Sequence, residues 1–218
     1  RFGKIQPALA TEWSVSEDGL VWTFKLRPGV KWVTYDGEIY GFVTAQDFVD
    51  GLKYVLTSEN RSKTANIVYN MIKNAKEYYN KEITDFNQVG VKALDKYTLQ
   101  YTLIKPIPYF LSTLTYTCFF PANGQFIKDV GGKFGIDNKH ILYNGSYIMK
   151  TYEPHHRRIL EKNPHYWDKE NVYIDRISMT YNKEANVLAP EMFLRGEIDH
   201  VNIGSDIIYE WMRDEKKK

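Results

Sequence analysis

The chain has 218 residues, of which 29 are Lys or Arg and 27 are Asp or Glu, and its formal net charge is +2. This nearly balanced charge gives no reason to expect a nucleic-acid partner or an anionic membrane surface. Hydrophobic residues make up 43% of the chain, enough to bury a sizeable core in one or two domains. Cys118 is the only cysteine, so an intrachain disulfide is excluded, and we expect a buried, unreactive side chain.

The first third of the chain predicts a β-hairpin. Trp22, Phe24 and Leu26 alternate with polar side chains, as expected of a half-buried strand. The Asp18-Gly19 pair before this strand tolerates the positive φ of a tight turn. Pro28-Gly29 is expected to end the strand, because proline cannot donate to the hydrogen-bond ladder.

A helix is predicted directly after a sequence that is typical of a helix start. Thr44-Ala45-Gln46-Asp47 has the form of a capping box in which Asp47 takes the usual place of Glu or Gln. Apolar residues then follow at helical spacing as far as Leu56. Further helical segments are expected at 65–79, at 109–114, within 124–138, at 184–195 around Pro190, and from Gly204-Ser205-Asp206 onward.

Two more pairs of strands are predicted. Residues 89–94 and 98–103 flank Asp95-Lys96, which suits a hairpin turn. Residues 143–149 and 158–162 flank Glu153-Pro154-His155 in the same way. Single strands are expected at 173–180 and 200–203. This order of elements predicts a mixed α/β chain with α+β character.

Six segments carry a likeness to one family, and they occur in that family's order. They are Ala8–Trp32, Thr44–Val49, Val89–Leu103 with Pro106, Asn144–Tyr147, Asn163-Pro164-His165-Tyr166-Trp167 with Ile174–Ile177, and Arg195-Gly196-Glu197-Ile198-Asp199. Together they resemble the extracytoplasmic peptide-binding proteins of ABC importers, the oligopeptide- and dipeptide-binding family. Each segment alone is common in turns and strands, so the likeness depends on all six segments occurring in the same order.

The resemblance implies a periplasmic-binding-protein-like lobe: a mixed sheet with flanking helices and an inserted small α/β subdomain. By this likeness, residues 1–30 belong to the first lobe, 31–120 form the inserted subdomain, 121–203 return to the first lobe, and 204–218 start the crossing to a second lobe. Members of the family are considerably longer than 218 residues. The chain is therefore expected to be a fragment without the second lobe, and to bind peptide weakly or not at all by itself.

The resemblance also implies a function. The family captures extended oligopeptides between two lobes and delivers them to an ABC permease in the membrane, and extended ligands can pair their backbone like an added strand. We therefore expect a monomeric substrate-binding component with an oligopeptide ligand, no cofactor and no nucleic-acid partner. The family is extracytoplasmic, and the composition suggests a lipid-anchored protein on the surface of a Gram-positive bacterium.

The candidate ligand-binding residues follow from the same resemblance. Val201, Asn202, Ile203 and Gly204 lie where the chain is expected to cross between lobes and border the cleft. The Asn202 amide offers both a donor and an acceptor to a peptide backbone, although it also suits a local turn. Gly204-Ser205 before a helix can present N–H groups to a ligand carboxylate, or serve only as an N-cap.

The sequence gives little support for an enzyme and leaves two alternatives to peptide capture. His155 and His156 could bind a metal or act as bases, but adjacent residues in an extended turn point to opposite faces. Gly131-Gly132-Lys133 lacks the rest of a phosphate-binding loop, so we expect no enzyme. The alternatives to peptide capture are a surface-exposed protein-interaction lobe, or a lobe that binds a non-peptide solute such as a metal complex, haem or a sugar.

Overall fold

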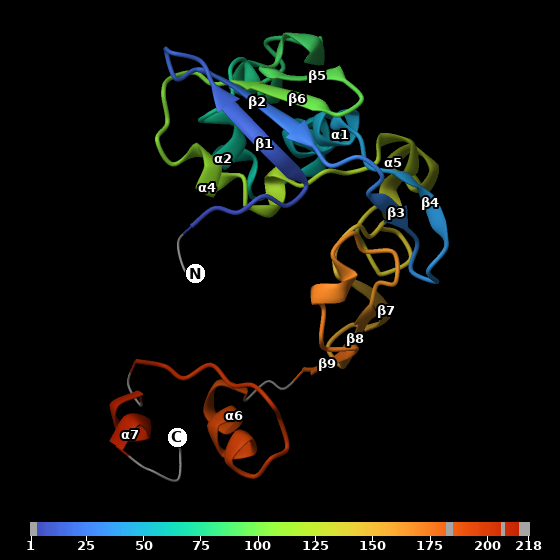
Figure 1. Cartoon of the computed structure of the whole chain (residues 1–218), viewed down its shortest axis with the longest axis vertical. Helices are drawn as coiled ribbons and strands as arrows, with labels where there is room; N and C mark the ends of the chain where they lie inside the picture. The colour runs from blue at the N-terminus through green and yellow to red at the C-terminus, as the bar shows by residue number, and fades with distance from the viewer. Residues whose placement is uncertain (1–3, 182–184, 206–207, 214–218) are drawn as a thin grey trace.

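Four antiparallel strands form the largest sheet of the protein (Figure 1). The structure is a computed structural model and describes residues 4–181, 185–205 and 208–213. The sheet has the order β1-β2-β6-β5. Its strands are β1 (Ala10–Val15), β2 (Val21–Leu26), β5 (Val91–Asp95) and β6 (Thr98–Thr102). The predicted first hairpin is confirmed: Gly19 has a φ of +73°, and the Asp18 carboxylate accepts a hydrogen bond from the Leu20 N–H at 3.0 Å.

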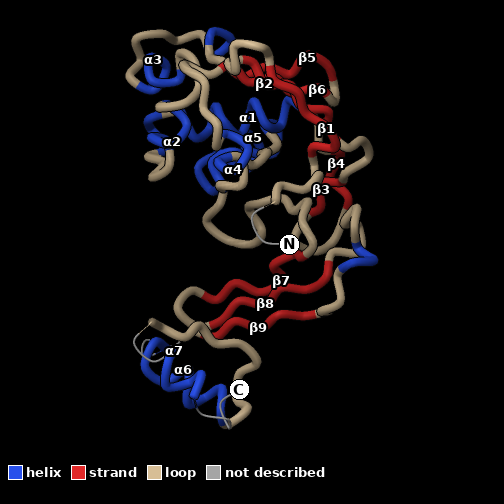
Figure 2. The backbone as a smooth tube through the Cα atoms, turned by 60° about the vertical axis from the view of Figure 1, so that its left-hand side comes forward, coloured by secondary structure: helices blue, strands red, loops and turns tan. Residues whose placement is uncertain are grey.

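Helices cover one face of this sheet (Figure 2). The longest, α1 (Ala45–Leu56), packs against β5 and β6. Leu52 and Leu56 of α1 are fully buried and share one hydrophobic core with Phe24 of β2 and Tyr101 of β6. The alternation predicted for β2 is confirmed, since its apolar face turns toward this core.

The capping box predicted for α1 is present. The Thr44 N–H donates to Oδ2 of Asp47 at 2.7 Å, and the Thr44 hydroxyl donates to the same oxygen at 3.1 Å. These bonds fix the backbone before the first helical turn, where N–H groups have no partner within the helix. A carboxylate at this end is also favoured by the helix dipole.

The helix predicted at 65–79 is wrong, because this segment forms two short helices, α2 (Ala65–Tyr69) and α3 (Ala75–Tyr79). Between them, Ile72 forms a β-bridge with Leu103, and the Lys73 N–H donates to a strand carbonyl at 2.9 Å. Asn74 then takes a left-handed conformation with a φ of +59°. Backbone groups that pair with a strand cannot continue a helical ladder, so the helix is interrupted.

Two further short helices lie within predicted segments. They are α4 (Phe110–Thr113) and α5 (Gly124–Val130). Single 3₁₀ turns occur at Ser58–Asn60, Phe86–Gln88, Thr117–Phe119, Gly131–Lys133 and Lys169–Asn171. The predicted burial of Cys118 is confirmed, and burial raises the pKa of its thiol.

Two smaller sheets extend the molecule away from the first one. They are formed by β3 (Lys31–Val33) with β4 (Ile39–Phe42), and by β7 (Tyr147–Glu153), β8 (Arg157–Lys162) and β9 (Arg176–Thr180) in that order. Val33 and Tyr143 exchange two backbone hydrogen bonds of 2.8 Å and bury a small core with Ile148. The strand predicted from Tyr143 therefore begins later, because Tyr143 pairs with Val33 and not with β8. The strand predicted from Tyr173 also starts later, since pairing with β8 begins at Arg176.

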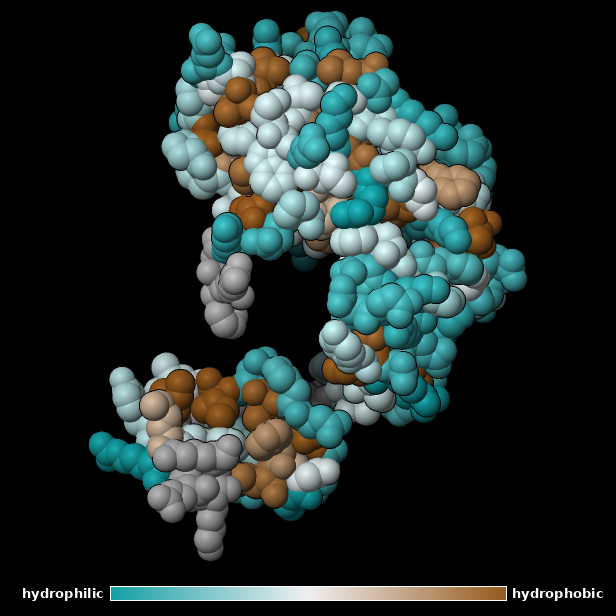
Figure 3. Space-filling view, in the orientation of Figure 1, coloured by the Kyte–Doolittle hydropathy of each residue, from teal (hydrophilic) through white to brown (hydrophobic). Residues whose placement is uncertain are grey.

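Two helices follow the last strand and lie apart from the sheets. α6 (Ala185–Leu194) continues through Pro190, and α7 (Ile208–Arg213) packs Trp211 against Phe193 of α6, with ring centroids 6.2 Å apart. The space-filling view shows an open hollow between these helices and the sheet-bearing part of the chain (Figure 3). None of the described helices combines the length and the apolar character of a membrane-spanning segment.

The strand predicted at 200–203 is wrong. These residues lie in an irregular segment between α6 and α7, and no strand among the described residues pairs with them. A strand needs such a neighbour, because its backbone groups are satisfied only by a ladder. Glu184, Asp206 and Ile207, which were expected in helices, lie outside the described residues.

The largest sheet is built from two segments of the chain. The largest sheet takes β1 and β2 from residues 1–30 and takes β5 and β6 from residues 31–120. Phe24 and Leu26 lie in the same hydrophobic core as α1. Residues from both segments therefore share one sheet and one hydrophobic core.

Candidate functional site

An apolar cleft of about 560 Å³ opens where the largest sheet meets the smaller ones. Its lining comes from segments that are far apart in the chain. They are Ile5, Gln6, Ala8–Ala10, Trp13, Phe24, Leu26, Trp32, Phe48, Leu99, Tyr101, Leu111, Leu114, Thr115, Phe119–Pro121, Leu142, Asn144, Gly145, Tyr166 and Trp167. None of these lining residues is an Asp, Glu, Lys, Arg or His. The apolar cleft is thus suited to hold an apolar group and lacks a pair of charged acid–base side chains.

Aromatic rings form the inner wall of the apolar cleft. Tyr101 on β6 is 1% exposed, and its ring meets Phe24 at 5.9 Å and Phe119 at 6.3 Å between centroids, both edge to face. Such arrangements add to the stabilisation that comes from burial alone. Burial also raises the pKa of Tyr101 well above its ordinary value, so this wall carries no charge.

Arg27 ties the rim of the apolar cleft together. Its guanidinium lies over the Trp167 ring, 3.8 Å from the centroid. Its backbone N–H donates to the Leu9 carbonyl at 2.7 Å, and its Nε donates to the Ala8 carbonyl at 3.2 Å. One residue at the end of β2 therefore positions both the segment before β1 and the indole of Trp167.

Asn163 holds another part of the rim of the apolar cleft. It is 1% exposed, and its side-chain amide donates to the Gly145 carbonyl at 2.9 Å. Its Oδ1 accepts a hydrogen bond from the His165 N–H at 2.9 Å. The Asn163-Pro164 turn thus holds Gly145 in place and leads directly to Tyr166. Burial raises the pKa of Tyr166.

Trp32 supplies a polar group at the base of the apolar cleft. Its indole is 3% exposed, and no described residue accepts a hydrogen bond from its Nε1. The indole lies near Asp47, whose pKa is raised mainly by burial and lowered in part by the hydrogen bond from the Thr44 N–H. The lining also includes the side-chain amides of Gln6 and Asn144 and the hydroxyl of Thr115, together with residues whose rings carry a polar group: Trp13, Tyr101, Tyr166 and Trp167.

The predicted ligand-binding residues do not line the apolar cleft. Val201 and Ile203 are half-buried, while Asn202 and Gly204 are exposed, all in the segment between α6 and α7. Sequence reasoning did not single out the apolar cleft as a site. The signal was nevertheless present, because Ala8–Trp13, Asn144-Gly145 and Tyr166-Trp167 are among the segments that carried the family likeness.

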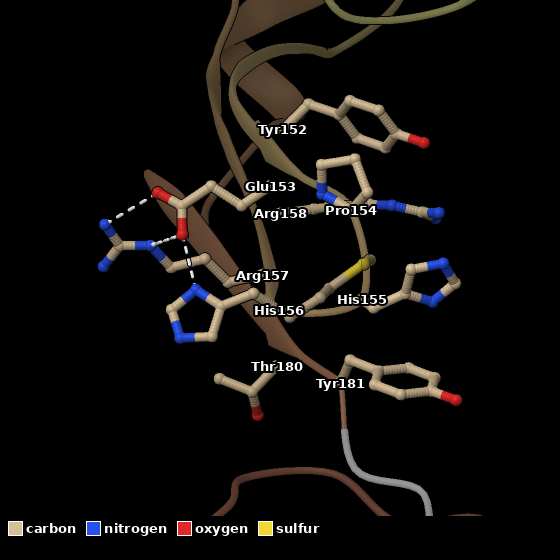
Figure 4. Close-up of a pocket in the computed structure, with 10 residues that line it drawn as sticks. Tyr152, Glu153, Pro154, His155, His156, Arg157, Arg158, Thr180 and Tyr181 are labelled. Carbon is tan, nitrogen blue, oxygen red and sulfur yellow. Dashed lines mark hydrogen bonds and ion pairs between the residues drawn. The ribbon is translucent and has the colours of Figure 1, made fainter.

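His155 and His156 are not brought together. Their rings point to opposite sides of the turn between β7 and β8, as expected (Figure 4). Within the described ranges, no group of three His, Cys, Asp or Glu side chains has the arrangement needed to hold a metal ion.

The fold and its apolar, aromatic cleft have the character of a ligand-binding lobe, and the comparisons identify its family. Residues 4–218 match the sequence model described as "Bacterial extracellular solute-binding proteins, family 5 Middle". The chain belongs to this family of solute-binding proteins. This confirms the family expected from the six segments and an extracytoplasmic class of protein.

The relatives by sequence include several streptococcal proteins. The chain is 44% identical over 182 residues to the oligopeptide-binding protein AmiA of Streptococcus pneumoniae, covering 83% of this chain and 27% of AmiA. It is 40% identical over 200 residues to the oligopeptide-binding protein SarA of Streptococcus gordonii, covering 90% of this chain and 30% of SarA. The chain thus spans less than a third of the length of these relatives.

Solved structures agree in fold. A periplasmic oligopeptide-binding protein from Borrelia burgdorferi superposes with a TM-score of 0.83 at 30% identity, over 96% of this chain and 41% of that one. The substrate-binding domain of an oligopeptide ABC transporter from Bacillus anthracis gives a TM-score of 0.84 at 31% identity, over 96% and 39% of the two chains. The expected periplasmic-binding-protein-like architecture is confirmed.

Proposed function

We propose that this chain is part of the substrate-binding component of an ABC importer, and that the whole protein captures extended oligopeptides. The observation that carries this proposal is the identity of 44% to a protein named for oligopeptide binding, over 83% of the chain. A structural neighbour at 26% identity and a TM-score of 0.80 is described as Listeria monocytogenes OppA bound to peptide. Its likeness covers 95% of this chain but 40% of the neighbour, so the remainder would come from a second lobe.

The apolar cleft has a defined part in this proposal. It would accept an apolar side chain of the peptide, because its walls are aromatic and aliphatic and its lining holds no charged side chain. The charged termini of a peptide would need groups supplied elsewhere. Weak binding by the chain alone is therefore the expected behaviour.

The segment of Val201, Asn202, Ile203 and Gly204 would contribute backbone-directed contacts. It joins α6 to α7 and runs along the side of these helices that faces the sheet-bearing part of the chain (Figure 1). Asn202 is exposed, and no described residue hydrogen-bonds to its side chain, so its donor and acceptor are available. An extended peptide bound in the hollow could pair its backbone with the backbone of this segment. Residues 204–218 would lead from here to the second lobe.

The oligomeric state, the partner and the location of the protein are proposed from the same family. We propose that it is a monomer that delivers peptide to an ABC permease, needs no cofactor, and is anchored by a lipid outside the cytoplasmic membrane of a Gram-positive bacterium. The streptococcal source of the relatives supports this assignment. The relatives are named for peptides, and nothing in the described structure favours a metal complex, haem or sugar.

Calorimetry with a mixed library of peptides tests the proposal, using the chain of 218 residues and the full-length protein that contains it. We expect micromolar or tighter binding by the full-length protein and weak or no binding by the chain. Asn202→Ala in the full-length protein should weaken binding about tenfold, as expected for a lost pair of backbone hydrogen bonds. Asn80→Ala, also exposed, is the control and should change nothing. Equal affinity of the chain and the full-length protein would contradict the two-lobed mechanism.

A further inference from the structure

The turn between β7 and β8 forms a second pocket, of about 360 Å³, together with the end of β9 (Figure 4). We call this region the hairpin tip. It consists of Tyr152, Glu153, Pro154, His155, His156, Arg157, Arg158, Met179, Thr180 and Tyr181. It shares no residue with the apolar cleft, so the peptide site proposed above does not account for it.

The strand register divides the hairpin tip into two faces. Arg157 pairs with Glu153 and with Thr180, whereas Arg158 pairs with Tyr152 and with Met179. Since successive side chains of a strand point to opposite faces, the two arginines are separated by the sheet. Figure 4 shows this directly: Arg157 lies with Glu153 on one side, and Arg158 lies with Tyr152 on the other.

The charge of Arg157 is already compensated. Its Nε and Nη2 donate to the two carboxylate oxygens of Glu153, each at 3.0 Å. The same carboxylate is 2.5 Å from Nδ1 of His156. The hydrogen bond from Arg157 is the largest cause that lowers the pKa of Glu153, and the hydrogen bond from His156 is the next. The Glu153 carboxylate therefore stays ionised, and its partners lie on its own face of the sheet.

Arg158 has no such partner. Among the described residues, none forms an ion pair or a side-chain hydrogen bond with its guanidinium, which lies 5.4 Å from the centre of the Tyr152 ring. Its neighbours on this face by register are Tyr152, Met179, Leu160 and Ile177, and none of them is acidic. Arg158 thus presents an uncompensated positive charge in the middle of an apolar and aromatic face.

Two more rings complete this face. His155 has a φ of +57°, a left-handed conformation that residues other than glycine rarely adopt. In this turn its ring lies on the Arg158 side and meets Tyr181 edge to face, with the centroids 5.6 Å apart. Tyr181 and Met179 are both about half exposed, at 54% and 48%.

We propose that the Arg158 face of the hairpin tip binds an acidic segment of a partner polypeptide. A carboxylate of the partner would receive the guanidinium of Arg158 in the bidentate geometry that arginine favours. The tyrosines and Met179 would contact the apolar side chains beside it, and Tyr, Arg and Met are the residues in which protein interfaces are enriched. A membrane surface is the less favoured occupant, because one uncompensated arginine provides little attraction to anionic lipid.

The test uses an acetylated and amidated hexapeptide of alternating glutamate and tyrosine, with glutamine in place of glutamate as the control peptide. Binding is measured by calorimetry on the chain and its variants. We expect saturable binding of the glutamate peptide only, and a loss of about tenfold or more in R158Q, as expected for a lost charged hydrogen bond. R176Q makes the same change of charge on the opposite face of the sheet and should retain binding within about twofold.

Equal losses in R158Q and R176Q would overturn the proposal, since they would indicate a general effect of net charge. Equal binding of the glutamine peptide would overturn it as well, as would stronger binding to phosphatidylglycerol vesicles than to the peptide. Thermal melts of both variants check that the fold is intact. Capture of unblocked peptides by the full-length protein is measured in parallel, and R158Q should leave it unchanged, so the two proposals fail independently.

Discussion

Asp47 and Asn123 join the N-termini of two helices that are far apart in the chain. The Asn123 amide donates to Oδ1 of Asp47 at 3.2 Å across a separation of 76 residues. Asp47 caps α1 through the Thr44 N–H at 2.7 Å, while Oδ1 of Asn123 caps α5 by accepting from the Phe126 N–H at 2.9 Å. A single pair of side chains therefore completes two helix starts and fixes α5 against α1.

Asp47→Ala should destabilise the chain by about 1–2 kcal/mol, because it removes the cap of α1 and leaves the Asn123 amide without an acceptor. The measurement is the free energy of unfolding from denaturant titration. Asp50→Asn is the control: its carboxylate accepts only from the Gln46 side chain among the described residues, at 2.9 Å, and we expect a change within about 0.5 kcal/mol. Equal losses in both variants would contradict the special role of Asp47.

The stability that Asp47 contributes should depend on pH. Burial is the largest cause that raises its pKa above the ordinary value of 3.8, so the folded state binds this proton more tightly than the unfolded state. The free energy of unfolding of the wild type, relative to D47A, should be largest below pH 3.8 and should fall as the pH rises through the raised pKa. Denaturant titrations of both proteins from acid to neutral pH measure this difference. A difference that grows with rising pH would contradict the assignment.

Gly51→Ala should destabilise the chain although it lies inside α1, where alanine normally improves a helix by about 1 kcal/mol. A Cβ at residue 51 would lie 2.6 Å from the Phe120 carbonyl oxygen and 3.1 Å from the Ala122 nitrogen. We expect a net loss of about 1–3 kcal/mol in the free energy of unfolding. At Gly41 a Cβ meets nothing within 4 Å, so Gly41→Ala should be tolerated. A stabilising Gly51→Ala would show that the two segments are not in close contact.

Arg27→Met should loosen the rim of the apolar cleft. The variant keeps the length of the side chain but loses the cation above Trp167 and the hydrogen bond to the Ala8 carbonyl. We expect a loss of about 1 kcal/mol in the free energy of unfolding, together with a changed tryptophan emission. Lys96→Met, whose ammonium is 5.4 Å from the Tyr97 ring, removes an equal charge and should leave the emission unchanged.

Local signals in the sequence predicted several elements because the interactions involved are themselves local. The β1–β2 turn depends on Asp18 and Gly19, which are adjacent. The start of α1 depends on Thr44 and Asp47, three residues apart. The opposite orientation of His155 and His156 also involves adjacent residues, with His155 in a left-handed conformation within the turn. The order of the motifs identified the family for the same reason, since each motif is a short segment.

Contacts between residues that are distant in the chain decided the features that the sequence did not predict correctly. The segment 65–79 has helical periodicity throughout, yet the bridge from Ile72 to Leu103 divides it. The segment 200–203 has the composition of a strand, but no described strand lies beside it to complete a ladder. At the apolar cleft, Asn163 contacts Gly145, and Arg27 contacts Trp167 and the segment before β1. A hydrogen bond or a ring contact acts over a few ångströms in space, and only the tertiary fold sets which distant residues come within that range.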